Sequence, residues 1–311
     1  MKHFSKKIII FILSSVLCVI PISVLDLLLS QLRPKSYLSS WNDLYTNNIN
    51  SDLVIFGTSR AQEHIVSSIV SDSLGIKVYN LGGKAHPIEM QLIRLKELLK
   101  TCDKKPNIIS LECCFLSIYD CNGIEKTYQL YPWMFGNKML EHYTALLRQS
   151  YSKYDFIVPL WRYKHGLASF ISESMKYGDS CDNGYYNRNK ERNLSEFNLG
   201  KRNLKFDIHP KRVEYLKEFL ETCKQNNIKI GIIYTPEYYW QELYINKQEI
   251  IDTIKKVANY SNVPFKDFSE DSIPINTESL YYSDYSHLTD KGARKFTSEC
   301  YIPYIKQLYG L

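Results

Sequence analysis

Three side chains that could form a nucleophilic catalytic set stand near the two ends of the chain. The C-terminal part reads Asp284-Tyr-Ser-His287, so one short loop carries a carboxylate and an imidazole. Far upstream, Ser59 follows an apolar run at 53–56 and a glycine, Gly57. A serine hydroxyl becomes a nucleophile when a base takes its proton, and the base works best when a carboxylate fixes its tautomer. The sequence therefore predicts that Ser59 attacks, that His287 is the base and that Asp284 orients it.

Short apolar runs alternate with helical patterns along most of the chain. We expect strands at 53–56, 76–79, 107–111, 228–234 and 264–268, and helices at 62–74, 88–99, 211–226, 248–260 and 289–308. Strands that alternate with helices of this length are typical of a parallel sheet with helices on both faces. We therefore predict an α/β three-layer sandwich with a mostly parallel five-stranded sheet. Ser59 would stand at the carboxyl end of a strand, where ligand sites of such sheets form.

The N-terminus carries a long apolar segment. Three lysines precede residues 8–25, which contain no charged side chain. Roughly 20 apolar residues cross a bilayer core, whereas the apolar core of a signal peptide is shorter. We predict a cytoplasmic tail at 1–7, an uncleaved single-pass membrane anchor at 8–30 and a domain at 31–311 that is periplasmic or extracellular. The alternative, a buried core helix, is disfavoured by the length of the run and its lack of a polar face.

The charge distribution argues against a nucleic-acid-binding protein, and the cysteine spacing argues against a zinc or redox protein. The net charge of +6 is modest and its lysines and arginines are scattered, so we expect no nucleic-acid partner. The cysteines outside the apolar segment form no C-x-x-C pair, so neither a zinc site nor a redox motif is indicated.

The middle of the chain, from about 115 to 209, breaks the alternation of strands and helices. A structureless loop of that length is uncommon in a compact domain, so we expect an inserted, partly helical cap over the strand ends. Tyr131, Trp133 and Trp161 lie in it, and flat aromatic faces pack well on sugar rings. We therefore name these three as candidate substrate contacts. The alternative is that they only hold the insertion together.

The motifs together resemble the SGNH (GDSL-like) hydrolase superfamily, in particular its membrane-anchored cell-envelope branch related to polysaccharide O-acetylation proteins. The first block of that family, Gly-Asp-Ser or a variant, matches residues 57–59. The last block, Asp-x-x-His-Leu-x-x-x-Gly, matches residues 284–292. The second block, an Asn followed by glycines, looks like residues 80–83. The resemblance implies the roles given above for Ser59, Asp284 and His287.

The resemblance also implies an oxyanion hole. Its donors would be the backbone N–H of Ser59 and that of Gly82 or Gly83, each worth about 3 kcal/mol in the transition state. The third block of the family is Gly-x-Asn-Asp, whose Asn completes this hole. Here the chain has Glu112 followed by two cysteines. A glutamate there would oppose an oxyanion, and loss of one donor costs on the order of 100-fold in rate.

We expect a membrane-anchored serine esterase or O-acyltransferase that removes or transfers O-acetyl groups on a cell-envelope polysaccharide. Only the resemblance points to acetyl groups and glycans. The chemistry needs no metal or organic cofactor. Expected partners are an acylated glycan or other ester substrate, the membrane through the N-terminal helix, and a membrane acyltransferase.

Three alternatives stand beside this prediction. A catalytically impaired protein with the same fold could bind a glycan or a membrane partner. A lipase or thioesterase for long acyl chains would want an apolar pocket, which the polar middle segment disfavours. Locally, Ser59 could be a helix N-cap, and Asp284 and Thr289 could cap the last helix.

Overall fold

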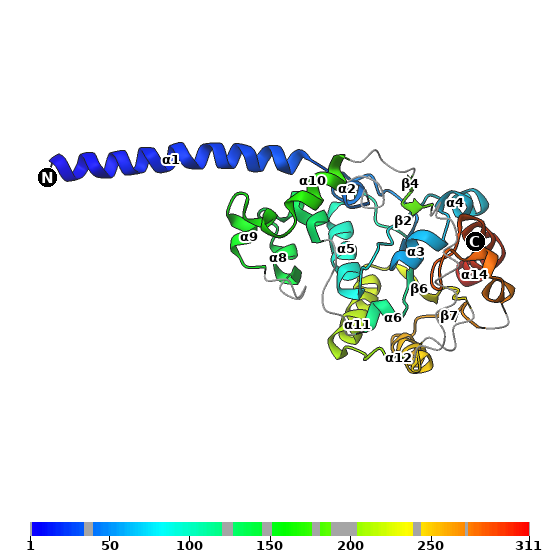
Figure 1. Cartoon of the computed structure of the whole chain (residues 1–311). Coiled ribbons are helices and arrows are strands. Elements are labelled where there is room, and N and C mark those ends of the chain that lie inside the picture. Colours follow the sequence, from blue (N-terminus) through cyan, green and yellow to red (C-terminus); the bar gives the residue numbers. More distant parts are fainter. Residues whose placement is uncertain are drawn as a thin grey trace. The chain divides into compact units, whose positions relative to one another are not determined.

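The computed structural model describes residues 2–33, 40–119, 127–144, 151–175, 181–187, 204–238, 244–270 and 273–310. The chain divides into two compact units. The N-terminal unit comprises Met1–Lys35 and Gly123–Tyr177, and the sheet unit comprises Ser36–Asn122 and Gly178–Leu311. Figure 1 labels many of their elements.

A parallel sheet forms the centre of the sheet unit. Its strands are β1 (Leu53–Phe56), β2 (Val78–Asn80), β3 (Ile108–Glu112), β6 (Lys229–Tyr234) and β7 (Phe265–Asp267). They are hydrogen-bonded in the order β2-β1-β3-β6-β7, and every neighbouring pair is parallel. The predicted five-stranded parallel sheet is confirmed.

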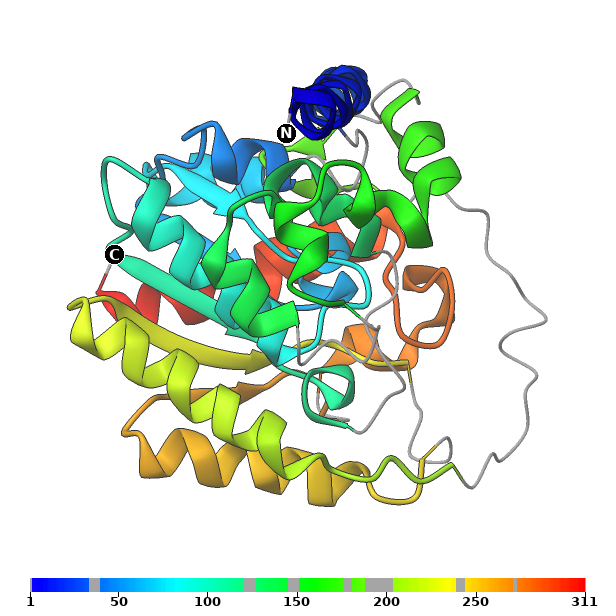
Figure 2. The same cartoon turned by 90° about the vertical axis from the view of Figure 1, so that its left-hand side faces the viewer.

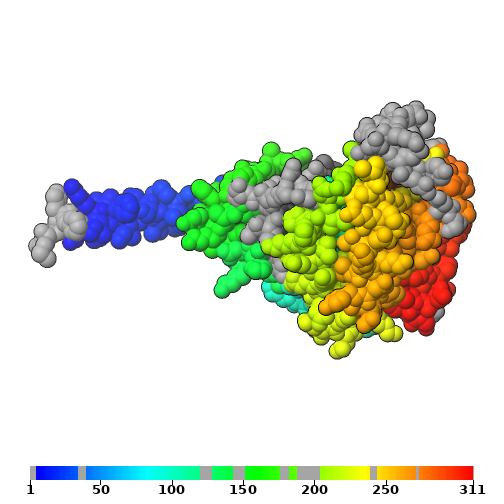
Figure 3. All heavy atoms as spheres, turned by 90° about the horizontal axis from the view of Figure 1, so that it is seen from below, coloured from blue at the N-terminus to red at the C-terminus, as the bar shows by residue number. Residues whose placement is uncertain are grey.

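Helices surround this sheet. They are α2 (Ser40–Tyr45), α3 (Ser59–His64), α4 (Ser67–Leu74), α5 (Ile88–Thr101), α6 (Phe115–Ile118), α11 (Pro210–Gln225), α12 (Lys247–Tyr260), α13 (Asp290–Phe296) and α14 (Ile302–Tyr309). The 3-10 segments η5 (Pro274–Thr277) and η6 (Ser279–Tyr281) precede the π-helical segment η7 (Thr297–Tyr301). Figure 2 shows α11 and α12 running next to each other, and Figure 3 shows both at the surface.

The two faces of β1 explain why the sheet is covered on both sides. Alternate side chains of a strand point to opposite faces. Leu53 and Ile55 belong to a buried cluster with Val70 of α4 and Phe296 of α13. Phe56 points the other way, and its ring centroid lies 5.3 Å from that of Phe219 in α11. All four residues of β1 are buried, as is typical of a central parallel strand.

The helix predicted at 62–74 is divided into α3 and α4. Ile65 between them has an extended backbone, with φ −118° and ψ 112°. The side-chain amide of Asn80 donates to the carbonyl oxygens of Ala61 and Ile65, at 2.7 and 3.0 Å. A continuous helix would use these carbonyls itself, so a side chain from β2 replaces helical hydrogen bonds at the break.

The last helix, predicted at 289–308, contains the π-helical segment η7. Pro303 follows this segment and has no N–H to donate to the carbonyl of Glu299. The N–H of Ile302 donates to the carbonyl of Thr297, five residues earlier. The wider turn therefore accommodates a proline that would interrupt a regular α-helix.

A hairpin of β4 (Cys181–Asp182) and β5 (Tyr185–Tyr186) lies against the end of β2. Asn183 and Gly184 at its tip both have positive φ, 44° and 85°, as a two-residue type I′ turn requires. The N–H of Asn80 donates to the carbonyl of Asn183 at 2.8 Å. A Cβ on Gly184 would stand 1.9 Å from the carbonyl oxygen of Asn80.

The N-terminal unit is built around α1 (Lys2–Gln31). Its other elements are η2 (Thr127–Leu130), α7 (Tyr131–Met134), α8 (Lys138–Thr144), α9 (Tyr154–Ile157), η3 (Trp161–His165) and α10 (Leu167–Met175). Residues 5–31 form one helix that is long and apolar enough to be a membrane span or a signal sequence. The predicted cap position of segment 115–209 over the strand ends stays a prediction.

We expect Gly184→Ala to destabilise the protein because the new methyl group would meet the backbone of Asn80. Gly75→Ala is the matched control, since Gly75 has φ 66° but nothing within 4 Å of an added Cβ. Positive φ alone costs about 1 to 2 kcal/mol for alanine. The extra overlap should add about 1 to 3 kcal/mol for Gly184→Ala. Urea unfolding of both variants measures the difference, and equal losses would contradict the close approach.

Candidate active site

Ser59 occupies the first position of α3, directly after the turn that leaves β1. Thr58 is the N-cap of this helix, because its side-chain oxygen accepts a hydrogen bond from the N–H of Arg60 at 3.2 Å. The alternative that Ser59 caps the helix is therefore wrong. The hydroxyl of Ser59 is free of that structural role. Its backbone N–H makes no hydrogen bond to another described residue.

Ser59, His287 and Asp284 form a continuous hydrogen-bonded chain. The Oγ of Ser59 lies 2.8 Å from Nε2 of His287, across 228 positions of sequence. The Nδ1 of His287 lies 2.9 and 3.0 Å from the two carboxylate oxygens of Asp284. With the ring proton on Nδ1 donated to Asp284, Nε2 can accept the proton of Ser59. This is the arrangement that activates a serine nucleophile.

The loop that carries His287 is held from two sides. The Oδ1 of Asp284 accepts from the backbone N–H groups of Ser286 and His287, each at 2.9 Å. It therefore fixes its own loop instead of capping the last helix, which Thr289 caps. Behind the loop, the N–H of Leu288 donates to Nε2 of His64 at 3.1 Å.

His64 is fully buried at the end of α3. Burial, together with the positive charge of Arg60, lowers the pKa of His64 well below its usual value. The ring is therefore neutral, and Nε2 can accept from Leu288. A buried neutral histidine thus connects the helix of the nucleophile to the loop of the base, a role that its sequence context did not indicate.

Glu112 holds the turn before Ser59. Its Oε2 accepts from both the N–H and the hydroxyl of Thr58, each at 2.8 Å. Burial raises the pKa of this carboxyl, although Arg60 and the hydrogen bonds from Thr58 act in the opposite direction. Glu112 is the last residue of β3, and its carboxylate accepts from the N–H and the hydroxyl of Thr58.

Gln91 holds the same turn from helix α5. Its side-chain oxygen accepts from the N–H of Gly57 at 3.3 Å, and its amide donates to the carbonyl of Gly57 at 2.5 Å. Gly57 has φ 147°, and a Cβ there would lie 2.6 Å from the Cβ of Glu112. The turn therefore requires glycine at this position and two buried polar side chains around it.

The structure does not support an oxyanion role for Gly82 or Gly83. The N–H of Gly82 donates to the side chain of Asn80 at 3.0 Å, and that of Gly83 donates to the carbonyl of Gly57 at 3.0 Å. Both groups are thus already used within the fold. The glycines are needed for space, because added Cβ atoms would lie 2.6 Å from the N of Gln62 and 2.0 Å from Nδ1 of His86.

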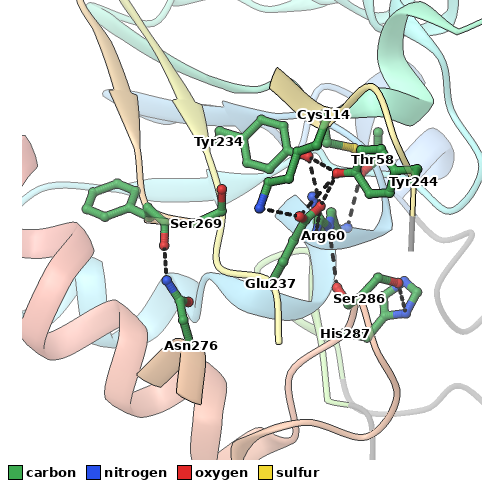
Figure 4. Close-up of polar contacts among 12 residues, drawn as sticks. Thr58, Arg60, Cys114, Tyr234, Glu237, Tyr244, Ser269, Asn276, Ser286 and His287 are labelled. Carbon is green, nitrogen blue, oxygen red and sulfur yellow. Dashed lines mark hydrogen bonds and ion pairs between the residues drawn. The ribbon is translucent and has the colours of Figure 1, made fainter. Parts of the chain in front are cut away.

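Arg60 connects three parts of the site and is almost fully buried (Figure 4). Its guanidinium pairs with Glu237 at 2.5 Å and donates to the carbonyl of Ser286 at 3.3 Å. Lys247 also pairs with Glu237, at 2.9 Å. Burial opposes ionisation of Glu237, but the charges of Arg60 and Lys247 outweigh it and lower its pKa to about 2.

Glu237 also accepts hydrogen bonds from two tyrosines. The hydroxyl of Tyr234 lies 2.8 Å from its Oε1, and that of Tyr244 lies 3.0 Å from the same oxygen. Figure 4 shows these side chains gathered around Arg60. The helix of the nucleophile, the end of β6 and the loop of His287 are therefore joined through one buried charged group.

The three aromatic candidates lie in the N-terminal unit. Tyr131 is fully buried, and its ring packs on those of Tyr163 and Phe170. It therefore has no exposed face for a sugar in this structure. The ring of Trp133 is covered by the guanidinium of Arg33, 4.3 Å from its centroid. Trp161 is 49% exposed. A sugar contact by Trp133 or Trp161 stays a prediction.

Within the described ranges, no group of three or more His, Cys, Asp or Glu side chains could hold a metal ion. Cys113 and Cys114 are buried free thiols beside Glu112, and burial raises the pKa of both. They are therefore poor nucleophiles in this setting.

The chain is similar to a protein-family model and to several solved structures. A protein-family model matches residues 189–309, and no curated protein matches the sequence. One similar solved structure is that of a GDSL-like lipase from Bacteroides thetaiotaomicron. Its sequence is 10% identical to this one, and the alignment covers 87% of this chain and 100% of the lipase chain with a TM-score of 0.41. Another is that of the psychrotrophic esterase EstA from Pseudoalteromonas sp., which is 11% identical. This alignment covers 83% of this chain and 98% of the esterase chain with a TM-score of 0.43.

We expect Glu237→Gln to lower the free energy of unfolding by about 3 to 5 kcal/mol, because the charge of Arg60 would stay buried without its partner. Glu218→Gln is the matched control, since Glu218 pairs with Lys96 at the surface and such pairs contribute about 0 to 1 kcal/mol. Urea unfolding of the full-length protein in detergent measures both. Equal small losses would contradict a structural role of the buried pair.

The same variant has a predictable pH dependence. The pKa of Glu237 is lower in the folded protein than its usual value of 4.5, so its stabilising contribution is present above about pH 4.5 and is lost as the pH falls toward 2. The difference in stability between wild type and Glu237→Gln should therefore shrink over this interval.

Proposed function

We propose that the chain is a serine esterase or O-acyltransferase whose nucleophile is Ser59. The observation that carries the proposal is the unbroken hydrogen-bonded chain from Ser59 through His287 to Asp284. The imidazole of His287 is 19% exposed, whereas the carboxylate behind it is 8% exposed. A substrate can therefore approach the base while Asp284 stays shielded from water.

The reaction follows from this geometry. Nε2 of His287 takes the proton of Ser59 while Oγ attacks the acyl carbonyl carbon, and the negative charge moves to the carbonyl oxygen. The N–H of Ser59 is the available backbone donor for that oxygen. His287 then gives its proton to the departing alcohol oxygen, which leaves an acyl group on Ser59. Water, or a hydroxyl of a second molecule, attacks this ester with His287 as base, and Ser59 is restored.

For the substrate, we propose an O-acetyl group on a cell-envelope polysaccharide. The support is the resemblance of three sequence blocks to the envelope branch of the SGNH superfamily and the long apolar helix α1. In this proposal α1 is a single-pass anchor, the preceding lysines stay in the cytoplasm, and residues 31–311 lie on the periplasmic or extracellular side. A membrane acyltransferase would be the donor partner if the chain transfers acyl groups.

We expect Ser59→Ala to lower hydrolysis of p-nitrophenyl acetate about a thousandfold or more, because the nucleophile and its base act as one unit. Ser73→Ala is the control, since Ser73 is an exposed serine on the neighbouring helix α4. Initial rates of the full-length protein in detergent decide the matter. Equal rates for wild type and Ser59→Ala would refute the catalytic proposal.

A second candidate function is a binding module that keeps the fold but lacks turnover. The observation that favours it is the scarcity of oxyanion donors: Gly82 and Gly83 use their N–H groups internally, and Glu112 replaces the Asn of the third block. A fluorophosphonate probe separates the two functions, because it reacts with an activated serine. Labelling of Ser59 in the folded protein supports the enzyme, and its persistent absence supports the binding module.

We also expect Glu112→Gln to keep most of the esterase activity and Glu112→Ala to lose it. Glutamine retains a side-chain oxygen that can accept from Thr58, whereas alanine leaves a buried N–H without a partner, at a cost of about 1 to 3 kcal/mol. Rates on p-nitrophenyl acetate and urea unfolding are measured together. Equal loss of activity in both variants, with folding intact, would show that the negative charge itself is needed.

A further inference from the structure

Asp26 fixes the C-terminal end of α1 to the rest of the N-terminal unit. Its neighbours Leu25 and Leu27 are about half exposed, whereas Asp26 itself is only 8% exposed. The N–H of Leu160 donates to its Oδ1 at 2.7 Å, and Arg162 pairs with its Oδ2 at 2.9 Å. Residues 160–162 are therefore held at the level of Asp26 along the helix.

Asp26 lies near the C-terminal end of the anchor predicted at 8–30, after the uncharged residues 8–25 and before three leucines at 27–29. Residues 8–25 rise about 27 Å at about 1.5 Å per residue, close to the thickness of about 30 Å of a bilayer core. When the anchor spans the bilayer, as proposed above, Asp26 lies near the boundary between hydrocarbon and headgroups. The residues bound to Asp26 lie at that same depth.

Three large apolar side chains are exposed beside this point. Phe135 is 52% exposed, Ile157 57% and Trp161 49%. Their backbone segments are hydrogen-bonded to one another. The N–H of Gly136, which follows Phe135, donates to the carbonyl of Phe156 at 2.8 Å, and Ile157 follows Phe156. The N–H of Trp161 donates to the carbonyl of Val158 at 3.2 Å. The guanidinium of Arg162 lies 5.4 Å from the ring centroid of Phe135, which links this group to Asp26.

Lysines accompany the exposed rings. The ammonium of Lys164 lies 5.5 Å from the ring centroid of Trp161, and that of Lys153 lies 5.4 Å from the ring centroid of Tyr154. Tyr154 is itself 50% exposed. Tryptophan and tyrosine are enriched at the membrane–water interface, and lysine extends its charge toward the headgroups from there. Figure 1 shows α9, which carries Tyr154 and Ile157, on the C-terminal side of α1.

We propose that Phe135, Ile157 and Trp161 form a membrane-binding patch that inserts into the lipid interface where α1 leaves the bilayer. The inference rests on the membrane anchoring proposed above. The partner is the lipid surface itself. The N-terminal unit would then lie on the membrane with a fixed orientation, held by α1 and by this second contact, instead of hanging from a single helix.

Lipid photocrosslinking tests the patch in the full-length protein. The protein is reconstituted into vesicles of phosphatidylcholine that carries a diazirine near the carbonyl end of one acyl chain, and adducts are mapped by peptide mass spectrometry. We expect adducts on α1 and on residues 154–161. The peptide with Tyr260, which is 81% exposed in the sheet unit, is the internal control and should carry several-fold fewer adducts.

A variant sharpens the test. Ile157→Ser with Trp161→Ser removes two exposed apolar side chains, so folding should be unchanged and adducts on residues 154–161 should fall several-fold while α1 stays labelled. Adducts on α1 with no excess on residues 154–161 over the Tyr260 peptide would overturn the patch, and would leave that surface to a protein partner. No adducts on α1 would overturn the anchoring, and the patch with it.

Discussion

The turn that carries Ser59 lies beneath helices and away from water, so each of its backbone groups needs a partner from the protein. Glu112 accepts from Thr58, and Gln91 exchanges two hydrogen bonds with Gly57. These partners come from β3 and α5, so side chains of the neighbouring strand and of a helix hydrogen-bond the turn before Ser59. The hydroxyl of Ser59 lies 2.8 Å from Nε2 of His287 at the end of this supported turn.

The buried charge of Arg60 extends this constraint to the C-terminal half of the chain. A guanidinium in the interior requires a carboxylate, and Glu237 supplies it from just beyond β6. The Nε of Arg60 donates to the carbonyl of Ser286, next to His287. Formation of the sheet and placement of His287 are therefore coupled, since the ion pair exists only when β6 lies two strands from β1.

The sequence allowed the strands and the serine, histidine and aspartate to be predicted because their signals are local. Apolar runs mark the strands, and Ser59 and His287 stand in short recognisable motifs. Gln91 and Glu237 carry no such signal: one is a polar residue within a helical pattern, and the other follows a strand. Their partners are 34 and 177 positions away, at Gly57 and Arg60.

The same limit explains the other differences. The break between α3 and α4 depends on the side chain of Asn80, which belongs to another element. The use of the Gly82 and Gly83 N–H groups depends on how the second loop packs against the first. Helical periodicity carries no information about either contact, because both depend on residues that meet only in the folded chain.

Thr58 and Ser59 have separate hydrogen-bond partners, so one can be changed without the contacts of the other. Thr58 caps α3 and binds Glu112, so the integrity of the helix depends on it. Ser59 contributes its hydroxyl to His287 alone. Under the proposed function, a mutation that removes this hydroxyl would abolish the reaction and leave the contacts of Thr58 in place. Under the proposed function, a change at one codon therefore separates a catalyst from a folded protein without catalytic activity.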